Sequence, residues 1–211
     1  MYATLDADTR RRLHEVLDQA RTRGFLGPGP IDPHIDRALQ LVTLVDEMPA
    51  RVMDLGSGGG VPGLPLALTV ATTNWVLLEG GSTRASFLIE AVSALGLAHR
   101  VSVIAERAEV AGRGSLRGGF DLVVARSFGP PAVTAECAAP FLRTGGRLLV
   151  AEPPGTSSIT SRWPAEGLQK LGMAAGPTIS SPTAAQILVQ VWPCPDAFPR
   201  RTGIPAKRPL F

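Results

Sequence analysis

Residues 54–63 place a carboxylate beside a run of glycines, a combination that suits the binding of a small charged ligand. The run reads Asp54-Leu-Gly-Ser-Gly-Gly-Gly-Val-Pro-Gly63 and directly follows a short apolar segment. Glycines let backbone N–H groups approach a ligand closely, and they avoid the side-chain clashes of a tight turn. We therefore interpret this run as a ligand-binding turn between a strand and a helix.

Two ligand classes fit these glycines. The spacing Gly58-x-Gly60-x-x-Gly63 satisfies a dinucleotide site, whereas Asp54-x-Gly56-x-Gly58-x-Gly60 has the form of a site for S-adenosylmethionine. The acid favours the second class, because a carboxylate attracts the ammonium and sulfonium groups of S-adenosylmethionine and repels a pyrophosphate. The alternative is a nucleotide- or NAD-binding protein that does not methylate.

Short apolar runs alternate with helical segments around this turn. The predicted strands cover residues 52–55, 75–78, 101–104, 120–125 and 147–151, and the predicted helices cover 62–71, 82–95, 106–112 and 131–142. Strands that are apolar on both faces are typical of a parallel sheet covered by helices. Ligands of such sheets bind at the carboxyl ends of the strands, where Asp54 and Glu79 lie, and Glu79 is placed to accept ribose hydroxyls.

Further elements flank this pattern. Ser82 and Gly96 are the expected caps of the helix over 82–95. A helix near 164–171 and a hairpin of two strands near 173–180 and 185–192 complete the predicted sheet. Before the first strand, residues 6–23 form an amphipathic helix with Leu13, Val16, Leu17 and Ala20 on its apolar face, and Asp32-Pro33 opens a helix that ends near Asp46.

Together the elements predict an α/β fold with a mostly parallel sheet and helices on both faces. If the glycine turn binds S-adenosylmethionine, this is the class I, Rossmann-like methyltransferase fold. The expected domains are an N-terminal helical extension (1–49), a methyltransferase domain that binds S-adenosylmethionine (50–193) and a basic tail that contains prolines (194–211).

Composition excludes several classes of protein. Hydrophobic residues make up 45% of the chain and charged residues 18%, which excludes wholesale disorder. The two cysteines, Cys137 and Cys194, form neither a disulfide framework nor a zinc motif. We expect no metal, no signal peptide, no membrane span and a cytoplasmic location. The net charge of +3 comes from the tail, whose cations include Arg200, Arg201, Lys207 and Arg208, so a protein-wide nucleic-acid-binding face is not expected.

Longer motifs resemble one family. The run Gly60-Val-Pro-Gly-Leu-Pro65, together with segments 77–88, 107–109, 125–128 and 199–210, resembles the bacterial methyltransferases that make N7-methylguanine in 16S ribosomal RNA, also called glucose-inhibited division protein B. On this resemblance, the chain would be a divergent member of that family. The resemblance implies S-adenosylmethionine as cofactor and ribosomal RNA, or the small ribosomal subunit, as partner.

The resemblance also implies roles for single residues. Gly56 and Val61 would line the methionine end of the cofactor, Glu79 would hold the ribose, Ala108 and Glu109 would meet the adenine edge, and Arg126 would border the pocket near the reacting group. Guanine N7 carries a free lone pair and needs no general base, so no catalytic residue is assigned and Arg126 is a candidate for positioning. The four tail cations are candidate RNA contacts on an extended segment; the alternative is a solvated end.

Departures from the family pattern include three positions that bear on the substrate. Many members have a Lys where this chain has Glu152, and Arg37 and Ala38 replace an Asp and a Ser. Exchanging Lys for Glu beside a polyanion turns an attraction into a repulsion. A related methyltransferase with a different RNA or a small molecule as substrate is therefore the second hypothesis. The sequence does not give the oligomeric state; we favour a monomer.

Overall fold

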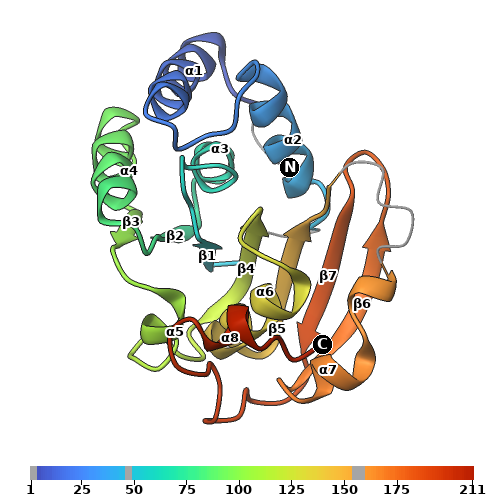
Figure 1. Cartoon of the computed structure of the whole chain (residues 1–211). Coiled ribbons are helices and arrows are strands. Elements are labelled where there is room, and N and C mark those ends of the chain that lie inside the picture. The colour runs from blue at the N-terminus through green and yellow to red at the C-terminus, as the bar shows by residue number, and fades with distance from the viewer. Residues whose placement is uncertain (1–3, 46–48, 154–159) are drawn as a thin grey trace. The chain divides into compact units, whose positions relative to one another are not determined.

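A computed structural model describes residues 4–45, 49–153 and 160–211 (Figure 1). Its contacts divide the chain into two compact units, residues 1–105 and 106–211. No helix in the described ranges is long and apolar enough to cross a membrane.

The first unit contains three parallel strands, in the order β3-β2-β1. Their bounds are β1 (Arg51–Leu55), β2 (Asn74–Leu78) and β3 (Val101–Ile104), close to the predicted ranges. Asp54 pairs with Leu77, and Leu55 with Leu78, so β1 and β2 end at the same edge. The glycine turn follows β1 and Glu79 follows β2, which brings the two predicted parts of the ligand site together.

Four helices accompany these strands: α1 (Ala7–Thr22), α2 (Asp32–Val42), α3 (Gly63–Thr69) and α4 (Ser82–Ala94). The apolar face predicted for α1 is buried as expected, and the carboxylate of Asp6 caps this helix by accepting from the Thr9 N–H. α2 packs against α3, and α1 packs against α4 (Figure 1). α2 ends at Val42, before the predicted end at Asp46, which lies outside the described residues.

The caps of α4 differ in part from the prediction. Gly96 follows the helix in the left-handed region, with φ +70°, as its predicted role requires. Ser82 is wrong as the N-cap, because Gly81 occupies that position and donates its N–H to Glu79 Oε1 at 2.7 Å. The start of α4 is thus fixed by the acid that ends β2.

The second unit contains β4 (Phe120–Arg126), β5 (Leu142–Ala151), β6 (Met173–Ile179) and β7 (Ala185–Gln190), in the order β4-β5-β7-β6. β4 and β5 are parallel, whereas β7 is antiparallel to both β5 and β6, which confirms the predicted hairpin. β5 begins five residues before its predicted start at Arg147, because Thr144-Gly-Gly146 interrupts the apolar run without interrupting the strand.

Helical segments cover parts of this second unit: α5 (Ala108–Ala111), α6 (Pro131–Ala138), α7 (Ala165–Gln169), α8 (Ile204–Lys207) and two 3-10 turns, Ala139–Phe141 and Thr160–Arg162. α6 packs on β5 and contacts α5 and α8, while α7 packs on β6 (Figure 1). The buried rings of Phe120 and Phe141 meet edge to face, with centroids 6.3 Å apart. The tail is therefore not extended as predicted, since α8 folds against the unit.

Candidate functional site

The glycine turn has a backbone that side chains would strain. Gly56, Gly58 and Gly60 have φ values of +70°, +54° and +92°, in the left-handed region that costs an L residue about 1–2 kcal/mol. Glycine thus occurs at every second position from 56 to 60 because the backbone is left-handed at every second position. Gly59 is required for a different reason: a Cβ there would lie 2.8 Å from the carbonyl oxygen of Phe25, which follows α1.

Asp54 joins the two ends of this turn through a hydrogen bond. Its carboxylate is buried, and Oδ2 accepts a hydrogen bond from the N–H of Gly63, the first residue of α3, at 3.1 Å. A Cβ at Gly63 would lie 2.5 Å from the same oxygen, so the contact requires glycine there. The N–H groups of Gly56 and Ser57 donate to the carbonyl of Leu78, at 2.8 and 3.0 Å. The acid chosen from the sequence as a partner for a cationic ligand therefore also shapes the turn.

Glu79 connects the turn to the next strand. Its side chain is buried, and Oε2 accepts a hydrogen bond from the N–H of Gly58 at 2.9 Å. The other oxygen, Oε1, accepts from Gly81 N at 2.7 Å and from Arg84 Nε at 3.0 Å. A carboxylate oxygen accepts more than one hydrogen bond. Oε2 is therefore suited to accept a ligand hydroxyl while it holds the glycine turn.

In the second unit, Ala108 and Glu109 begin α5 and are both buried. Glu109 Oε1 accepts a hydrogen bond from the N–H of Gly203 at 2.9 Å, and Oε2 lies 3.8 Å from Arg107 Nε. Arg107 and Glu109 are not an ordinary solvated pair, because Glu109 is buried and bonded to the tail. The structure thus connects the predicted adenine-side acid to the C-terminal segment.

Arg126 lies where the sequence placed it, at the carboxyl end of β4 and half-buried. The next residue, Ser127, has φ +55°, a left-handed conformation that non-glycine residues adopt at a cost of order 1–3 kcal/mol. Strain of this kind is found where the chain must present a group in a fixed direction. A positioning role for Arg126 stays a prediction.

The four tail cations separate into two kinds. Arg200 donates to the fully buried carboxylate of Glu136 from its backbone N–H and Nε, both at 2.9 Å, and from Nη2 at 2.6 Å. Nη2 also donates to the carbonyl of Arg208 at 2.7 Å. The other cations, Arg201, Lys207 and Arg208, are exposed. This arrangement explains why the tail is folded, and it was not predicted from the sequence.

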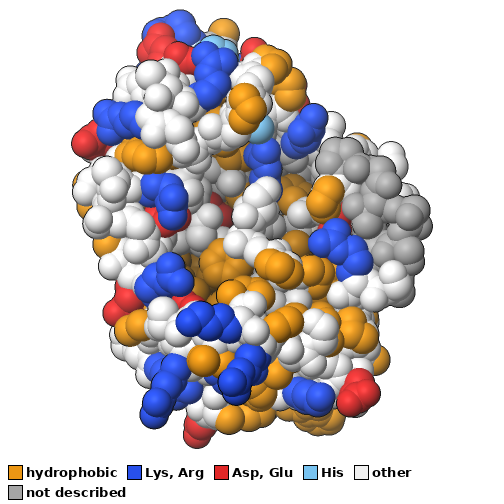
Figure 2. Space-filling view, in the orientation of Figure 1, with side chains coloured by type: hydrophobic (Ala, Val, Ile, Leu, Met, Phe, Trp, Pro, Cys, Tyr) orange, Lys and Arg blue, Asp and Glu red, His pale blue; other side chains and the backbone are white. Residues whose placement is uncertain are grey.

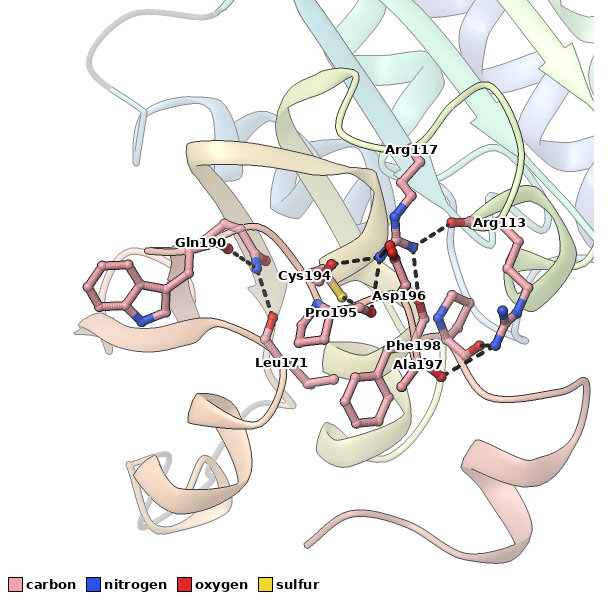
Figure 3. Close-up of polar contacts among 12 residues, drawn as sticks. Arg113, Arg117, Leu171, Gln190, Cys194, Pro195, Asp196, Ala197 and Phe198 are labelled. Atoms are coloured by element: carbon pink, nitrogen blue, oxygen red, sulfur yellow. Dashed lines mark hydrogen bonds and ion pairs between the residues drawn. The ribbon is translucent and has the colours of Figure 1, made fainter.

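Two further residues that sequence reasoning missed hold the same segment. The guanidinium of Arg117 donates to the carbonyls of Cys194 and Phe198, at 2.7 and 2.8 Å, and that of Arg113 donates to the carbonyl of Pro199 at 2.5 Å (Figure 3). The available signal was Glu136, an acid within the otherwise apolar stretch of α6, since a buried carboxylate requires a cationic partner.

The acid that departs from the family pattern is neutralised within the second unit. Glu152 is buried; Oε2 accepts from Arg162 Nη1 at 2.5 Å and Oε1 accepts from Trp163 Nε1 at 2.8 Å. Of the other two departures, Arg37 is exposed on α2 and Ala38 is buried in the same helix. The repulsion of a polyanion expected from Glu152 is thus offset by its ion pair.

The structure favours neither a cysteine nucleophile nor, within the described ranges, a metal site. Burial, with the negative charges of Glu109 and Glu136, raises the pKa of the Cys137 thiol, and burial raises the pKa of Cys194 to about 11. Both thiols are therefore protonated at neutral pH and unsuited to act as nucleophiles. Across the described ranges, no group of three or more His, Cys, Asp or Glu side chains is arranged to hold a metal ion.

Two comparisons with solved structures show the fold. A methyltransferase described as SAM-dependent O-methyltransferase from Thermotoga maritima has a TM-score of 0.56 at 16% identity, over 84% of this chain and 71% of that one. An O-methyltransferase from Bacillus cereus, solved in complex with SAH, has a TM-score of 0.57 at 15% identity, over 84% and 89% of the two chains. The predicted fold class, that of class I methyltransferases, is confirmed.

Sequence comparisons show the family. The profile described as rRNA small subunit methyltransferase G matches residues 31–153. A ribosomal RNA small subunit methyltransferase G from Syntrophomonas wolfei is 32% identical over 87% of each chain. Another, from Sorangium cellulosum, is 42% identical over 57% of this chain, an alignment that spans about half of that protein (51%). The resemblance seen in the sequence is confirmed: the chain belongs to the rRNA small subunit methyltransferase G family.

Proposed function

We propose that this protein transfers the methyl group of S-adenosylmethionine to N7 of a guanine in the RNA of the small ribosomal subunit. Family membership supports the enzyme class and the cofactor. The observation that carries the site assignment is the hydrogen bond between Glu79 Oε2 and Gly58 N, which joins the two predicted halves of the cofactor site. The substrate would place the reaction in the cytoplasm.

The residues present fit the cofactor. The left-handed glycines remove side chains from the turn, and an added Cβ at Gly58 would meet two backbone carbonyl oxygens, those of Gly56 and Phe25, at an ordinary contact distance of 3.8 Å. Asp54 and Glu79 contribute two buried carboxylates to the turn. Such a site attracts an ammonium and a sulfonium group and repels a pyrophosphate, which supports S-adenosylmethionine over a dinucleotide.

Each residue would then have a defined task. Gly56 and Val61 would contact the methionine end of the cofactor, Glu79 would accept the ribose hydroxyls, and Ala108 with Glu109 would meet the adenine. The bound cofactor supplies an electrophilic methyl group on sulfur. Because guanine N7 carries a lone pair, the chain would only align the base and exclude water. Arg126 is proposed to position the base, a task that requires no proton transfer.

The pairing of Glu152 bears on the competing hypothesis. A different substrate was considered because Glu152 replaces a family Lys beside a polyanion. The ion pair with Arg162 and the bond from Trp163 offset that charge. Because the charge of Glu152 is offset within the protein, the exchange of Lys for Glu no longer argues against a phosphate-rich substrate. This supports ribosomal RNA over a substrate without phosphates.

The test uses 16S RNA from a strain in which the gene is deleted. Purified protein and S-adenosylmethionine with a labelled methyl group should place label at N7 of one guanine, and complementation should restore this methylation in cells. Gly58→Asp should do neither, because its side chain enters the turn beside the Asp54 carboxylate. Label on another atom, on small molecules only, or none at all from the wild-type protein would overturn the proposal.

A further inference from the structure

We propose that residues 194–211, the C-terminal segment, form a prefolded surface that binds RNA phosphates through Arg201, Lys207 and Arg208, with Arg200 acting only as its anchor. This inference rests on the proposed function and extends it by naming the surface that holds the RNA. It also divides four neighbouring cations, which look alike in the sequence, into one structural residue and three binding residues.

The start of the segment is fixed by two arginines from the chain that precedes β4. Arg117 donates to the carbonyls of Cys194, Pro195 and Phe198, at 2.7, 3.0 and 2.8 Å. Arg113 donates to the carbonyl of Pro199 at 2.5 Å. Figure 3 shows both guanidinium groups pointing at the backbone of the segment. Because these bonds go to backbone carbonyls, they fix the path of the chain whatever its side chains are.

The middle and the end of the segment are anchored separately. Arg200 is bonded to Glu136, and Gly203 donates its N–H to Glu109 at 2.9 Å. At the end, the ring of Phe211 packs on Gly167, where an added Cβ would lie 2.0 Å from the ring. The segment is therefore ordered before any ligand binds, so an RNA contact would not have to offset the entropy of folding it.

The other three cations of the C-terminal segment have exposed side chains. Lys207 is the last residue of α8, Arg208 follows it, and Arg201 lies between Arg200 and the left-handed Gly203; all three side chains are exposed. Figure 2 shows Lys and Arg side chains gathered over the part of the surface where Figure 1 places α5 and α8.

Charge favours a polyanion as the occupant. The only acid of the segment is Asp196, which lies 3.5 Å from Arg117. Two of the three binding residues are arginines, whose guanidinium groups pair with phosphate oxygens in two parallel hydrogen bonds. We therefore assign the surface to the phosphates of the RNA substrate and not to an acidic protein.

The experiment compares two triple variants that lose the same charge. The test variant is Arg201→Gln/Lys207→Gln/Arg208→Gln. The control is Arg11→Gln/Arg12→Gln/Arg143→Gln, which removes arginines whose side chains are 60%, 44% and 58% exposed elsewhere. Binding of an unmethylated 16S RNA transcript is measured by filter retention at several salt concentrations, and S-adenosylhomocysteine binding by calorimetry.

Each phosphate contact on single-stranded RNA contributes about 0.7 to the slope of log K against log salt. The slope of log K against log salt should therefore be shallower by about 2 for the test variant than for the wild type. If both proteins bind equally at about 1 M salt, this corresponds to roughly 100-fold weaker binding of the variant at about 0.1 M salt. S-adenosylhomocysteine affinity should be unchanged in both variants, and the control should keep the wild-type slope.

The outcomes separate this inference from the proposed function. A test variant with the wild-type slope and affinity overturns the inference, whereas failure of the wild-type protein to methylate 16S RNA overturns the proposed function. Weaker binding of the test variant to the assembled small subunit, with unchanged binding to the transcript, would assign the surface to an acidic ribosomal protein and would also overturn the inference.

Discussion

Glu136 of α6 and Arg200 of the C-terminal segment form an ion pair with a buried carboxylate across 64 residues of sequence, and Arg200 Nη2 lies 2.6 Å from Glu136 Oε2. The side chain of Glu136 is 0% exposed and that of Arg200 is 26% exposed. The carboxylate accepts three hydrogen bonds from Arg200, one of them from its backbone, so the pair fixes the chain as well as the side chain. Breaking this pair would leave a charge in the interior.

Arg200→Ala should therefore lower the free energy of unfolding by about 3–5 kcal/mol, the usual cost of removing one partner from a buried ion pair. Arg201→Ala, one residue later and exposed, should change it by less than about 0.5 kcal/mol. Urea denaturation of the two variants measures the difference. Equal stability of both would show that the segment is not anchored at Arg200.

Gly58→Ala and Gly60→Ala form a matched pair, because both residues have a left-handed backbone. An added Cβ has no neighbour closer than 3.8 Å at Gly58, but would lie 2.4 Å from Leu64 Cδ1 at Gly60. Gly58→Ala should therefore cost about 1–2 kcal/mol of stability, the cost of the backbone conformation alone, and weaken S-adenosylhomocysteine binding.

Gly60→Ala should be less stable than Gly58→Ala in urea denaturation, since it adds a steric clash in the core to the same backbone cost. Calorimetry with S-adenosylhomocysteine completes the comparison. If Gly58→Ala bound the ligand as tightly as the wild type, the backbone at Gly58 would not line the cofactor site.

Glu79→Gln tests the carboxylate that joins turn and strand. The amide keeps the shape but loses the charge that strengthens the hydrogen bonds from Gly58 and Gly81, and hydrogen bonds to a charged group contribute about 1.5–3 kcal/mol each. We expect S-adenosylhomocysteine to bind at least 10-fold more weakly. The control is Arg84→Ala, which removes a half-exposed partner of Glu79 but leaves both backbone donors in place. Calorimetry should show a smaller loss for the control; the reverse order would argue against a ribose contact at Glu79.

The pattern of apolar runs was sufficient to predict the strands, since β1 and β3 begin within one residue of the predicted ranges and end with them. The glycine turn was predictable because a left-handed backbone favours glycine, which has no Cβ, over other residues. The helix predicted over 131–142 is shorter, because Pro140 lacks an N–H, and α6 gives way to a 3-10 turn after Ala138. The folded tail was missed because the acid in the apolar stretch of α6, Glu136, indicates that a cationic partner is needed but not which one, and Arg200 lies 64 residues further along the chain.

The buried thiols should give a clear dependence on pH. Burial raises the pKa of Cys194 to about 11, and burial also raises that of Cys137. Below the ordinary thiol pKa, folded and unfolded chains both carry neutral thiols; above it only the unfolded chain ionises, so stability is lost as pH rises from about 9 towards 11. The native protein should react slowly with iodoacetamide at pH 8, and the urea midpoint should fall less above pH 9 in Cys194→Ala. Rapid alkylation at pH 8 would contradict the burial of the thiols.

Glu152→Lys restores the residue type that many family members carry, and the structure predicts that it is harmful here. The new ammonium would face Arg162, which lies 2.5 Å from the carboxylate of Glu152, and Trp163 Nε1 would lose its acceptor. A buried like-charge contact and an unpaired indole N–H should together lower the free energy of unfolding by several kcal/mol, about 3 or more. Glu152→Gln should cost less, because its amide oxygen still accepts from Trp163. If Glu152→Lys instead kept wild-type stability in urea and bound 16S RNA more tightly, the internal ion pair would not be what offsets this departure from the family.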